Sequence, residues 1–259
     1  MKFKIFTNNN ELSIKTKEIV CNKLISNGFI LDNDNYELAI AIGGDGSFLH
    51  MIKDTNYNSD LLYVGINSGT LGFLQEVKME EIDKFIFELK SNKYKIEEVG
   101  IQETIVNGHD KYYSFNDVLV RDKDLKLFKC NISIDGNVFE DYTGDGILIS
   151  TSMGSTAHNL SYGGSIVYST FSSLQITPLG PLNSKVYSTL SNSIIVPSKM
   201  KIKLIPNNKN IILTVDGINI TYNNIDSIET CIYDKKIKLL RFSHYNFFQK
   251  INEKLIEVK

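Results

Sequence analysis

The chain has 259 residues, enough for one large domain or two small ones with a substantial core. Its 28 Lys and Arg residues nearly balance its 30 Asp and Glu residues, for a formal net charge of −2. This balance argues against a nucleic-acid-binding footprint and against a polybasic membrane patch. Three widely spaced cysteines fit neither a disulfide framework nor a zinc site. No signal peptide or membrane-spanning apolar run is evident, so we expect a cytoplasmic protein with reduced thiols.

The first part of the chain alternates expected strands and helices. Residues 2–6 alternate polar and apolar side chains as a strand does, and the apolar runs at residues 38–42 and 61–66 have the length of buried strands. Apolar residues recur at helical spacing within residues 12–24 and 79–89. Such alternation predicts an α/β domain over residues 1–97, with a parallel sheet covered by helices.

From about residue 98 the pattern changes to short β-like runs. They are separated by the hairpin dipeptides Asn107-Gly108, Asp135-Gly136 and Asp216-Gly217. This pattern predicts an antiparallel β-sandwich domain over residues 98–235. Helical spacing returns near residues 246–258, within a C-terminal segment that covers residues 236–259. The predicted fold class is therefore α/β plus all-β.

The most informative segment, Gly43-Gly44-Asp45-Gly46, directly follows a buried strand and precedes a helix. Ligands of open α/β sheets bind at the carboxyl ends of the strands. The glycines allow close approach of a phosphate, and the helix start offers free N–H groups. A carboxylate in such a loop suits a hydroxyl or a magnesium ion beside a phosphate, which favours phosphoryl transfer. The alternative is a plain turn with a capping aspartate.

Two further segments are associated with strand-like runs, one after such a run and one within it. The glycine-rich run at residues 65–74 ends in Phe73-Leu74 and is either a second wall of the same crevice or a loop with a core anchor. The pair Asn116-Asp117 interrupts an apolar run, and a buried pair of this kind must be hydrogen-bonded or face a ligand. Sugar hydroxyls would suit it, and a satisfied bulge or turn explains it equally well.

A fourth segment, residues 143–161, combines the acidic turn Gly144-Asp145-Gly146, an apolar strand and a loop dense in Ser, Thr and Gly. Such a loop can hold a polar ligand, although an N-capped helix start explains part of it. The chain has no P-loop, no G-x-G-x-x-G helix start and no Gly-x-Ser-x-Gly elbow. Its four histidines lack metal-ligand spacing, so metal ligands remain unassigned.

Taken in order, these four segments resemble the motifs of bacterial-type NAD kinases. The family's N-T-G-x-L-G-F motif appears at residues 67–73, and its N-[ED] pair is Asn116-Asp117. The long D-G-x-x-x-S-T-P-T-G-S-T-A-Y-x-x-S motif appears at residues 145–161. The resemblance runs from about residue 38 to the C-terminal helix.

The resemblance implies an α/β domain followed by a β-sandwich, with NAD bound in the crevice between them and the C-terminal helix packing back on the first domain. It also implies a homodimer or homotetramer, with NAD and either ATP or polyphosphate as substrates and Mg²⁺ as cofactor. The NAD-binding residues would be Asp45, Gly46, Phe73, Asn116, Asp117, Asp145, Thr156, Ala157, His158, Asn159 and Ser161. The donor phosphates would meet Gly43, Gly44, Gly46 and His50.

The chain departs from the family pattern at several positions near the long motif. His158 replaces the tyrosine that lies against the adenine, and an imidazole can still stack on a purine. Ser152 and Met153 stand where Pro and Thr are usual, Tyr162 where a small residue is common, and Thr70 where a histidine is common. The frequent Gln after Asp216-Gly217 is Ile218 here, so we carry no ligand role to that position.

The resemblance implies transfer of phosphate from ATP to the 2′-hydroxyl of the adenosine ribose of NAD, giving NADP. We expect Asp45 to orient and deprotonate that hydroxyl as the catalytic base. Two alternatives remain open: a lipid kinase of the diacylglycerol or sphingosine type, which resembles this family around Gly-Gly-Asp-Gly, and a catalytically silent NAD(P)-binding protein.

Overall fold

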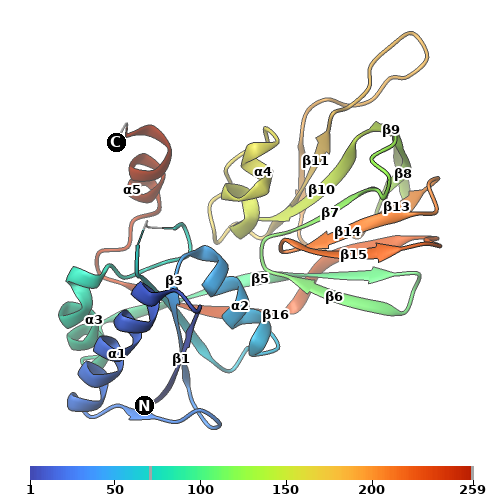
Figure 1. The fold of residues 1–259 in the computed structure, drawn as a ribbon. Helices are drawn as coiled ribbons and strands as arrows, with labels where there is room; N and C mark the ends of the chain where they lie inside the picture. Colours follow the sequence, from blue (N-terminus) through green and yellow to red (C-terminus); the bar gives the residue numbers. More distant parts are fainter. Residues whose placement is uncertain (70–71, 258–259) are drawn as a thin grey trace. The chain divides into compact units, whose positions relative to one another are not determined.

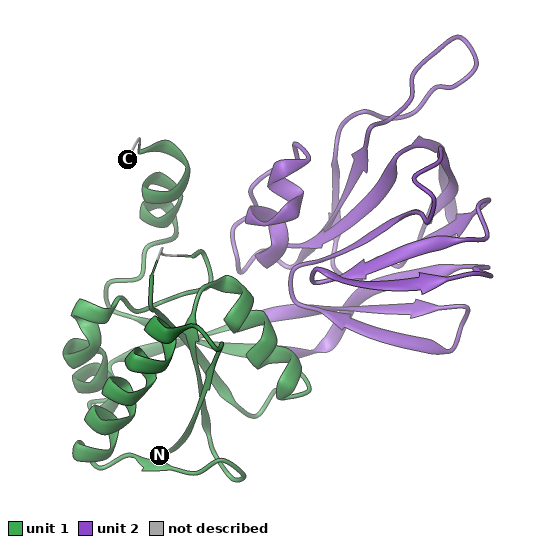
Figure 2. Ribbon diagram, viewed as in Figure 1, with its two compact units in different colours: residues 1–98, 237–259 green, residues 99–236 purple. Residues whose placement is uncertain are grey.

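The computed structural model describes residues 1–69 and 72–257, so Thr70 lies outside the described residues. Figure 1 traces the order of the elements, and Figure 2 shows two compact units. Unit 1 comprises residues 1–98 and 237–259, and unit 2 comprises residues 99–236. The chain thus leaves unit 1, builds unit 2 and then returns. In the described part of the chain, no helix is long and apolar enough to cross a membrane.

Unit 1 is built on a parallel sheet with the strand order β2-β1-β3-β4. These strands are β1 (Lys2–Thr7), β2 (Ile30–Leu31), β3 (Leu38–Gly43) and β4 (Leu62–Asn67). The connecting helices are α1 (Glu11–Ser26) and α2 (Asp45–Asp54), and β4 is followed by a 3₁₀ turn (Met79–Glu81) and α3 (Ile82–Lys90). Every residue of β3 is buried, as expected of a central parallel strand. The predicted parallel α/β fold is confirmed.

The returning C-terminal segment completes unit 1. The end of the long strand β16 (Ile228–Phe242) pairs in parallel with β4, and its Leu240 and Phe242 join the core under α3. The predicted C-terminal helix is present as α5 (Phe247–Ile251), followed by one π-helical turn (Asn252–Ile256). The segment packs back on the first unit, as the resemblance implied.

Unit 2 contains two layers of strands. A six-stranded antiparallel sheet has the order β12-β11-β10-β7-β14-β15. Its strands are β7 (Asp117–Asp122), β10 (Gly146–Thr151), β11 (Ser173–Leu179), β12 (Ile194–Pro197), β14 (Ile211–Val215) and β15 (Ile218–Tyr222). The other layer uses β5 (Tyr94–Val106), β6 (Asp110–Ser114), β8 (Phe128–Ile134), β9 (Asn137–Gly144), β13 (Ile202–Pro206) and the start of β16.

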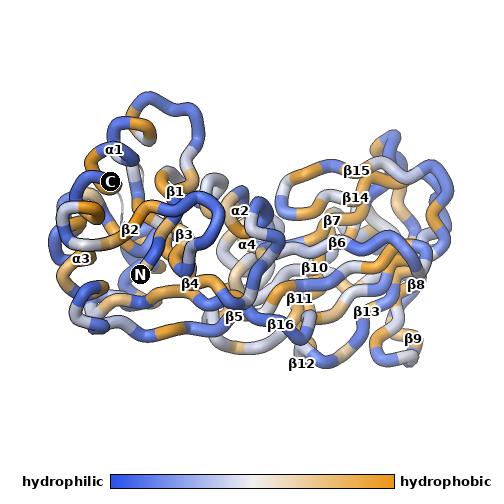
Figure 3. Tube along the Cα trace, turned by 90° about the horizontal axis from the view of Figure 1, so that it is seen from below, coloured by the Kyte–Doolittle hydropathy of each residue, from blue (hydrophilic) through white to orange (hydrophobic). Residues whose placement is uncertain are grey.

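Three hairpins and one apolar core explain the sandwich. Both residues of each predicted dipeptide, at 107–108, 135–136 and 216–217, have positive φ, as a two-residue hairpin turn requires. Inward-facing residues of the two layers form one cluster, which includes Val120, Ile149, Phe128, Ile202 and Leu213. Figure 3 shows apolar residues along the strands and polar ones in the loops. The predicted β-sandwich is confirmed.

Candidate active site

The Asp45 carboxylate is held by backbone groups of a distant loop in unit 1. Asp45 is the first residue of α2, and only Gly44 separates it from the end of β3. Its Oδ2 accepts a hydrogen bond from the Phe73 N–H at 2.9 Å, and its Oδ1 accepts one from the Leu74 N–H at 2.9 Å. Two backbone donors on one carboxylate fix its orientation, while the residue keeps partial exposure to solvent.

Gly72 makes room for that carboxylate. A Cβ atom on Gly72 would lie 1.9 Å from Asp45 Oδ1 and 2.7 Å from Oδ2. No side chain can be accommodated there unless Asp45 moves. Gly72 of the predicted motif therefore allows the Asp45 carboxylate to lie close to the backbone of this loop.

Gln75, which the sequence analysis did not single out, connects the same two loops. Its Nε2 donates to the Gly44 carbonyl at 2.8 Å, and the whole side chain is buried. Gly44 is the N-cap of α2, yet no side chain caps the helix there. Gln75 thus holds the start of α2 through the Gly44 carbonyl. Gly46 and His50, which lies one turn later, are exposed to solvent.

Lys250, on α5, fixes the loop that holds Asp45. Its ammonium donates to the carbonyls of Phe73 at 3.2 Å and Gln75 at 2.5 Å, and lies 3.8 Å from Glu76 Oε2. Burial lowers the pKa of Lys250 to about 8, against the opposing effect of the Glu76 charge. The carbonyl groups on either side of the Leu74 N–H are therefore fixed by the C-terminal helix.

A buried ion-pair network supports this arrangement. Arg241 donates to Glu76 at 3.1 Å and makes a two-point contact with Glu97 at 3.1 and 3.2 Å. Glu76 also accepts from the Phe242 N–H at 3.0 Å. Paired charges with several hydrogen bonds each can remain buried, whereas removing one partner would leave an uncompensated charge.

In unit 2, Asp216 holds the backbone of the Asn116-Asp117 pair. Its carboxylate accepts from the N–H groups of Phe115 at 2.6 Å, Asn116 at 2.8 Å and Asp117 at 3.1 Å. Asp216 lies in the β14–β15 hairpin, about 100 residues further along the chain. Sequence reasoning saw only its turn propensity and missed this positioning role.

The two side chains of the pair have unusual surroundings. Asn116 Oδ1 is buried and has no hydrogen-bond partner among the described residues. Asp117 is 2% exposed, and burial together with the Asp216 charge raises its pKa to about 7. The His158 imidazole is close by, with its Nδ1 3.9 Å from Asp117 Oδ1. A buried, unpaired amide oxygen beside such a carboxyl group is typical of a ligand site.

The long motif, residues 145–161, folds as the turn at Asp145, strand β10, a 3₁₀ turn (Met153–Thr156) and one turn of helix α4 (His158–Ser161). The Thr151 hydroxyl donates to the Phe115 carbonyl at 2.6 Å and accepts from the Gly154 N–H at 3.1 Å. A Cβ atom on Gly154 would lie 2.1 Å from the Asn116 carbonyl oxygen. The loop is therefore packed directly against the Asn116-Asp117 backbone, so the third and fourth sequence segments meet.

The remaining predicted residues of this loop differ in accessibility. The side chain of Asn159 is fully buried; its Oδ1 accepts from the Thr177 hydroxyl at 2.6 Å, and its amide lies 2.8 Å from that of Gln175. This internal network gives Asn159 a structural role. The His158 side chain is 55% exposed, Ser161 is exposed, and Thr156 and Ala157 are half-buried.

Asp145 lies apart from these contacts within unit 2. It connects β9 to β10, is exposed, and its N–H donates to the Leu179 carbonyl at 2.8 Å. Among the described residues, no group of three or more His, Cys, Asp and Glu side chains could hold a metal ion. The three cysteines are free thiols, and burial raises the pKa of Cys130 to about 12.

Comparisons with known proteins agree with these motifs. A family model described as the ATP-NAD kinase C-terminal domain matches residues 116–241. The NAD kinase of Finegoldia magna is 37% identical over 265 residues, which cover 97% of each chain. The chain belongs to the NAD kinase family.

A further relative is similar in sequence, and two solved structures are similar in fold. NAD kinase 1 of Halalkalibacterium halodurans is 29% identical, with 99% of each chain covered. A yeast NADH kinase complexed with NADH has a TM-score of 0.87 at 19% identity, covering 100% of this chain and 89% of that one. An Archaeoglobus fulgidus NAD kinase complexed with ATP has a TM-score of 0.76 at 17% identity, with both chains fully covered. At such identities the two structures support the fold of the NAD kinase family.

Proposed function

We propose that this chain transfers a phosphoryl group from ATP or polyphosphate to the 2′-hydroxyl of the adenosine ribose of NAD, giving NADP. Family membership supports the reaction. The observation that carries the chemistry is the Asp45 carboxylate, which two backbone N–H groups hold in a fixed orientation. A fixed carboxylate after a buried strand, beside a glycine turn and an uncapped helix start, suits an acceptor hydroxyl next to a phosphate.

In this proposal Asp45 accepts the proton of the ribose 2′-hydroxyl while the hydroxyl oxygen attacks the terminal phosphorus of the donor. The donor's terminal bridging P–O bond breaks as the new O–P bond forms, and ADP leaves when ATP is the donor. Most of the catalytic effect comes from alignment and from compensation of phosphate charge. Backbone N–H groups of residues 43–46 and the exposed His50 would provide part of that compensation.

Unit 2 would bind the NAD itself. The unpartnered Asn116 oxygen accepts a hydrogen bond from a ribose hydroxyl, and Asp117 accepts or donates one according to its protonation. Asp145 and the loop of Thr156, Ala157 and Ser161 hold the outer parts of the nucleotide. His158 stacks on the adenine, with Tyr162 beside it at a ring distance of 6.5 Å. The buried Asn159 side chain supports that loop through its contacts with Thr177 and Gln175.

Magnesium would be held largely by the donor phosphates, because Mg²⁺ commonly keeps several waters and uses only one or two protein carboxylates. The described residues offer isolated carboxylates such as Asp45 instead of a multi-ligand cage, which fits an ion that arrives with the nucleotide. The ion would neutralise charge on the transferred group.

The first test is NADP⁺ formation by the purified protein with NAD⁺, ATP and Mg²⁺, compared with Asp45→Asn. Loss of the base should lower kcat by about 10²–10⁴-fold, while the Kd for NAD⁺ changes little. Asp83→Asn is the matched control, since Asp83 is also in the first turn of a helix but pairs with Lys23 at the surface. Unchanged kcat in Asp45→Asn would show that Asp45 is not the base.

The same assay separates the two alternatives. Turnover of diacylglycerol or sphingosine in place of NAD⁺ would point to a lipid kinase. NAD⁺ binding without turnover, with both ATP and polyphosphate as donor, would indicate a silent binding protein.

We also propose a homodimer or homotetramer and a cytoplasmic location. Exposed apolar residues on the edge strand β9 support self-association, since Val138 is 74% exposed and Phe139 is 37% exposed. Light scattering of the purified chain tests the assembly.

A further inference from the structure

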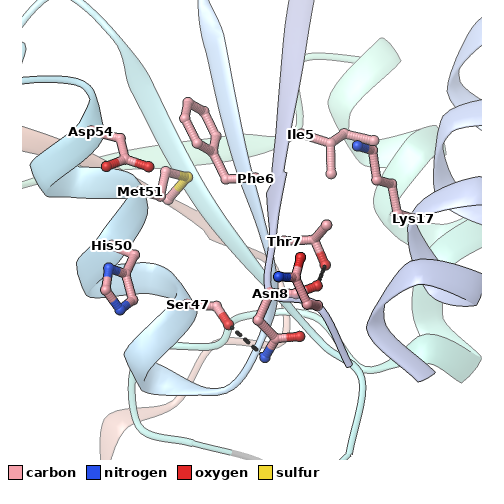
Figure 4. A pocket seen from close by; sticks show the side chains of 10 residues that line it. Ile5, Phe6, Thr7, Asn8, Lys17, Ser47, His50, Met51 and Asp54 are labelled. Carbon is pink, nitrogen blue, oxygen red and sulfur yellow. Dashed lines mark hydrogen bonds between the residues drawn. The ribbon is translucent and has the colours of Figure 1, made fainter. Parts of the chain in front are cut away.

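Three of the four histidines lie near a carboxylate within the part of the chain that the structure describes. The pairs are His109 with Asp110 at 3.7 Å, His158 with Asp117 at 3.9 Å and His244 with Glu81 at 3.8 Å. The fourth histidine, His50, lines a cavity of unit 1 beside α2 (Figure 4). Of the three paired carboxylates only one is buried, because the Asp117 side chain is 3% exposed, against 42% for Asp110 and 30% for Glu81.

The buried Asp117 carboxyl group needs a compensating positive charge to be ionised. Asp216, in the β14–β15 hairpin, brings a second carboxylate to the same stretch of backbone, where it accepts from the N–H groups of residues 115–117. Burial and this negative neighbour raise the pKa of Asp117 to about 7. On the neighbouring strand β10, the residue paired with Asp117 is Ser150, which does not titrate. The imidazole of His158 on α4 is placed to supply the missing positive charge.

His158 carries a positive charge at a lower desolvation cost than a buried group would, because its side chain is 55% exposed. Imidazoles change charge near neutral pH. The distance of 3.9 Å between His158 Nδ1 and Asp117 Oδ1 is longer than a hydrogen bond but short enough for an ion pair. Tyr162, whose ring centre is 6.5 Å from that of the imidazole, is a further titratable side chain beside it. One proton can therefore reside on either member of the pair without changing the net charge of the pair.

A ribose with two neighbouring hydroxyls would select one of these two positions of the proton. Asn116 Oδ1, which is buried and has no partner among the described residues, can accept from one hydroxyl. The other hydroxyl donates most strongly to Asp117 when the carboxyl group is ionised, because hydrogen bonds to charged acceptors are about twice as strong as neutral ones. Ionised Asp117 places the proton on His158, and an imidazolium attracts the face of an adenine more strongly than a neutral ring does. Ribose and adenine therefore favour the same protonation state.

We propose that protonated His158 is the charge partner that Asp117 requires in order to bind the ribose of NAD. In the bound state Asp117 is negative and His158 is positive, so the proton on the imidazole belongs to the site. When this proton is lost, the imidazole is neutral and the buried carboxylate stays charged beside Asp216 and the phosphates of the dinucleotide. The affinity for NAD therefore falls as pH rises above the neutral range. This inference rests on the proposed function and adds a proton to its NAD site.

The test is calorimetric titration of the full-length wild-type protein with NAD⁺ at pH 8.5, in two buffers that differ in their enthalpy of ionisation. The difference between the two apparent binding enthalpies gives the number of protons taken up for each NAD⁺ bound. We expect an uptake of about 0.5–1 proton, and a Kd for NAD⁺ about tenfold higher at pH 9 than at pH 7. An uptake of zero, or the same Kd at both pH values, would overturn the proposal.

Two variants identify the group that takes up the proton. His158→Tyr keeps an aromatic ring for the adenine but removes the imidazole, so the proton uptake and the change of Kd between pH 7 and pH 9 should both disappear. His109→Tyr is the matched control, because it breaks an exposed pair of similar separation in the same unit, and it should behave as wild type. The pKa of Lys250 is also about 8, but this lysine is present in all three proteins. Proton uptake that persists in His158→Tyr would show that the imidazole is not the group.

The calorimetric experiment needs neither donor nor turnover, so it separates this inference from the proposed reaction. A wild-type protein that takes up the proton with NAD⁺ but never forms NADP⁺ would refute the proposed function alone. A protein that forms NADP⁺ and binds NAD⁺ without proton uptake would refute the role of His158 alone. Absence of NAD⁺ binding would refute both.

Discussion

At Gly72, the space that a side chain would occupy is filled by the Asp45 carboxylate. Gly72→Ala should therefore displace Asp45 and lower kcat at least a hundredfold, close to the effect of Asp45→Asn. Overpacking should also cost about 1–3 kcal/mol of stability. Gly69→Ala is the control, because a Cβ atom there meets nothing within 4 Å. Steady-state kinetics and urea unfolding of both variants check this, and equal kcat values would contradict it.

Asp117 makes the stability of unit 2 depend on pH. Its pKa rises from 3.8 in the unfolded chain to about 7 in the fold, through burial and the Asp216 charge. Between these values the folded protein retains a proton that the unfolded chain has lost. The free energy of unfolding therefore falls as pH rises from about 4 to about 7. Above pH 7 it stays at the lower value, because the buried carboxylate is then charged in the folded protein as well.

Asp117→Asn should remove this dependence. The measured quantity is the free energy of unfolding of the variant minus that of wild type. We expect this difference to be roughly 2–4 kcal/mol more favourable to the variant at pH 8 than at pH 4. Urea unfolding of the protein without NAD at the two pH values measures it. His158→Ala in both backgrounds isolates the nearby imidazole, which is 3.9 Å from the carboxyl group. If Asp117→Asn and wild type differ in stability by the same amount at pH 4 and pH 8, Asp117 is not the group responsible for the pH dependence.

Among the elements, the five-residue helix α5 has an effect on the loop that holds Asp45, through the Lys250 side chain. Lys250→Met keeps most of the apolar stem but removes the donors to the Phe73 and Gln75 carbonyls. We expect kcat to fall about tenfold, with smaller changes in the KM values, because the loop that orients Asp45 loosens. Lys250→Arg should restore part of the rate.

Lys84→Met is the matched control for Lys250→Met, since Lys84 is an exposed lysine of α3. A Lys250→Met enzyme that unfolds at the same urea concentration as wild type but turns over slowly would support the positioning role. Full activity would contradict it.

The elements themselves were largely predictable from local sequence. The strand before Asp45, the strand-like run around Asn116-Asp117, the amphipathic helices and the three hairpins follow from apolar periodicity and turn residues. The four motif segments also identified loops that the structure brings together within each unit. What escaped prediction were partners far apart in sequence: Asp216 on residues 115–117, and Lys250 on residues 73–75.

These partners could not be read locally because nothing in their neighbourhood marks them. Asp216 has the signature of a hairpin turn, and Lys250 that of an ordinary helix residue near a chain end. Only the fold shows that their polar groups are directed to backbone atoms about 100 and 175 residues away. Asn159 shows what the motif alone could not indicate, because its side chain is buried in hydrogen bonds with Thr177 and Gln175 while its predicted contact with NAD stays a prediction.

At the scale of the whole molecule, the two units differ in how they are assembled from the chain. Unit 2 is continuous over residues 99–236, whereas unit 1 needs residues 237–259 for the outer strand beside β4 and for Leu240 and Phe242 of its core. The predicted domain limits at 97 and 235 are proposals that fragments can test.

Residues 99–236 expressed alone should fold cooperatively, because their core cluster is complete within that range. Residues 1–98 alone should not, because they lose part of a buried sheet and the Arg241 partner of Glu76. Circular dichroism with thermal melting measures both fragments, and adding residues 237–259 through a flexible linker should rescue the second one. A cooperative melt of residues 1–98 alone would refute this division.

The contact between Lys250 and residues 73–75 also sets the moment at which the protein becomes active during synthesis. Asp45 is synthesised early, but the side chain that secures its loop follows about 200 residues later. A chain that stops before residue 250 would contain the four motif segments and still lack the side chain that fixes the loop around Asp45, the proposed base. Premature termination or C-terminal trimming by a peptidase should therefore lower the activity of the protein, at least as much as Lys250→Met does.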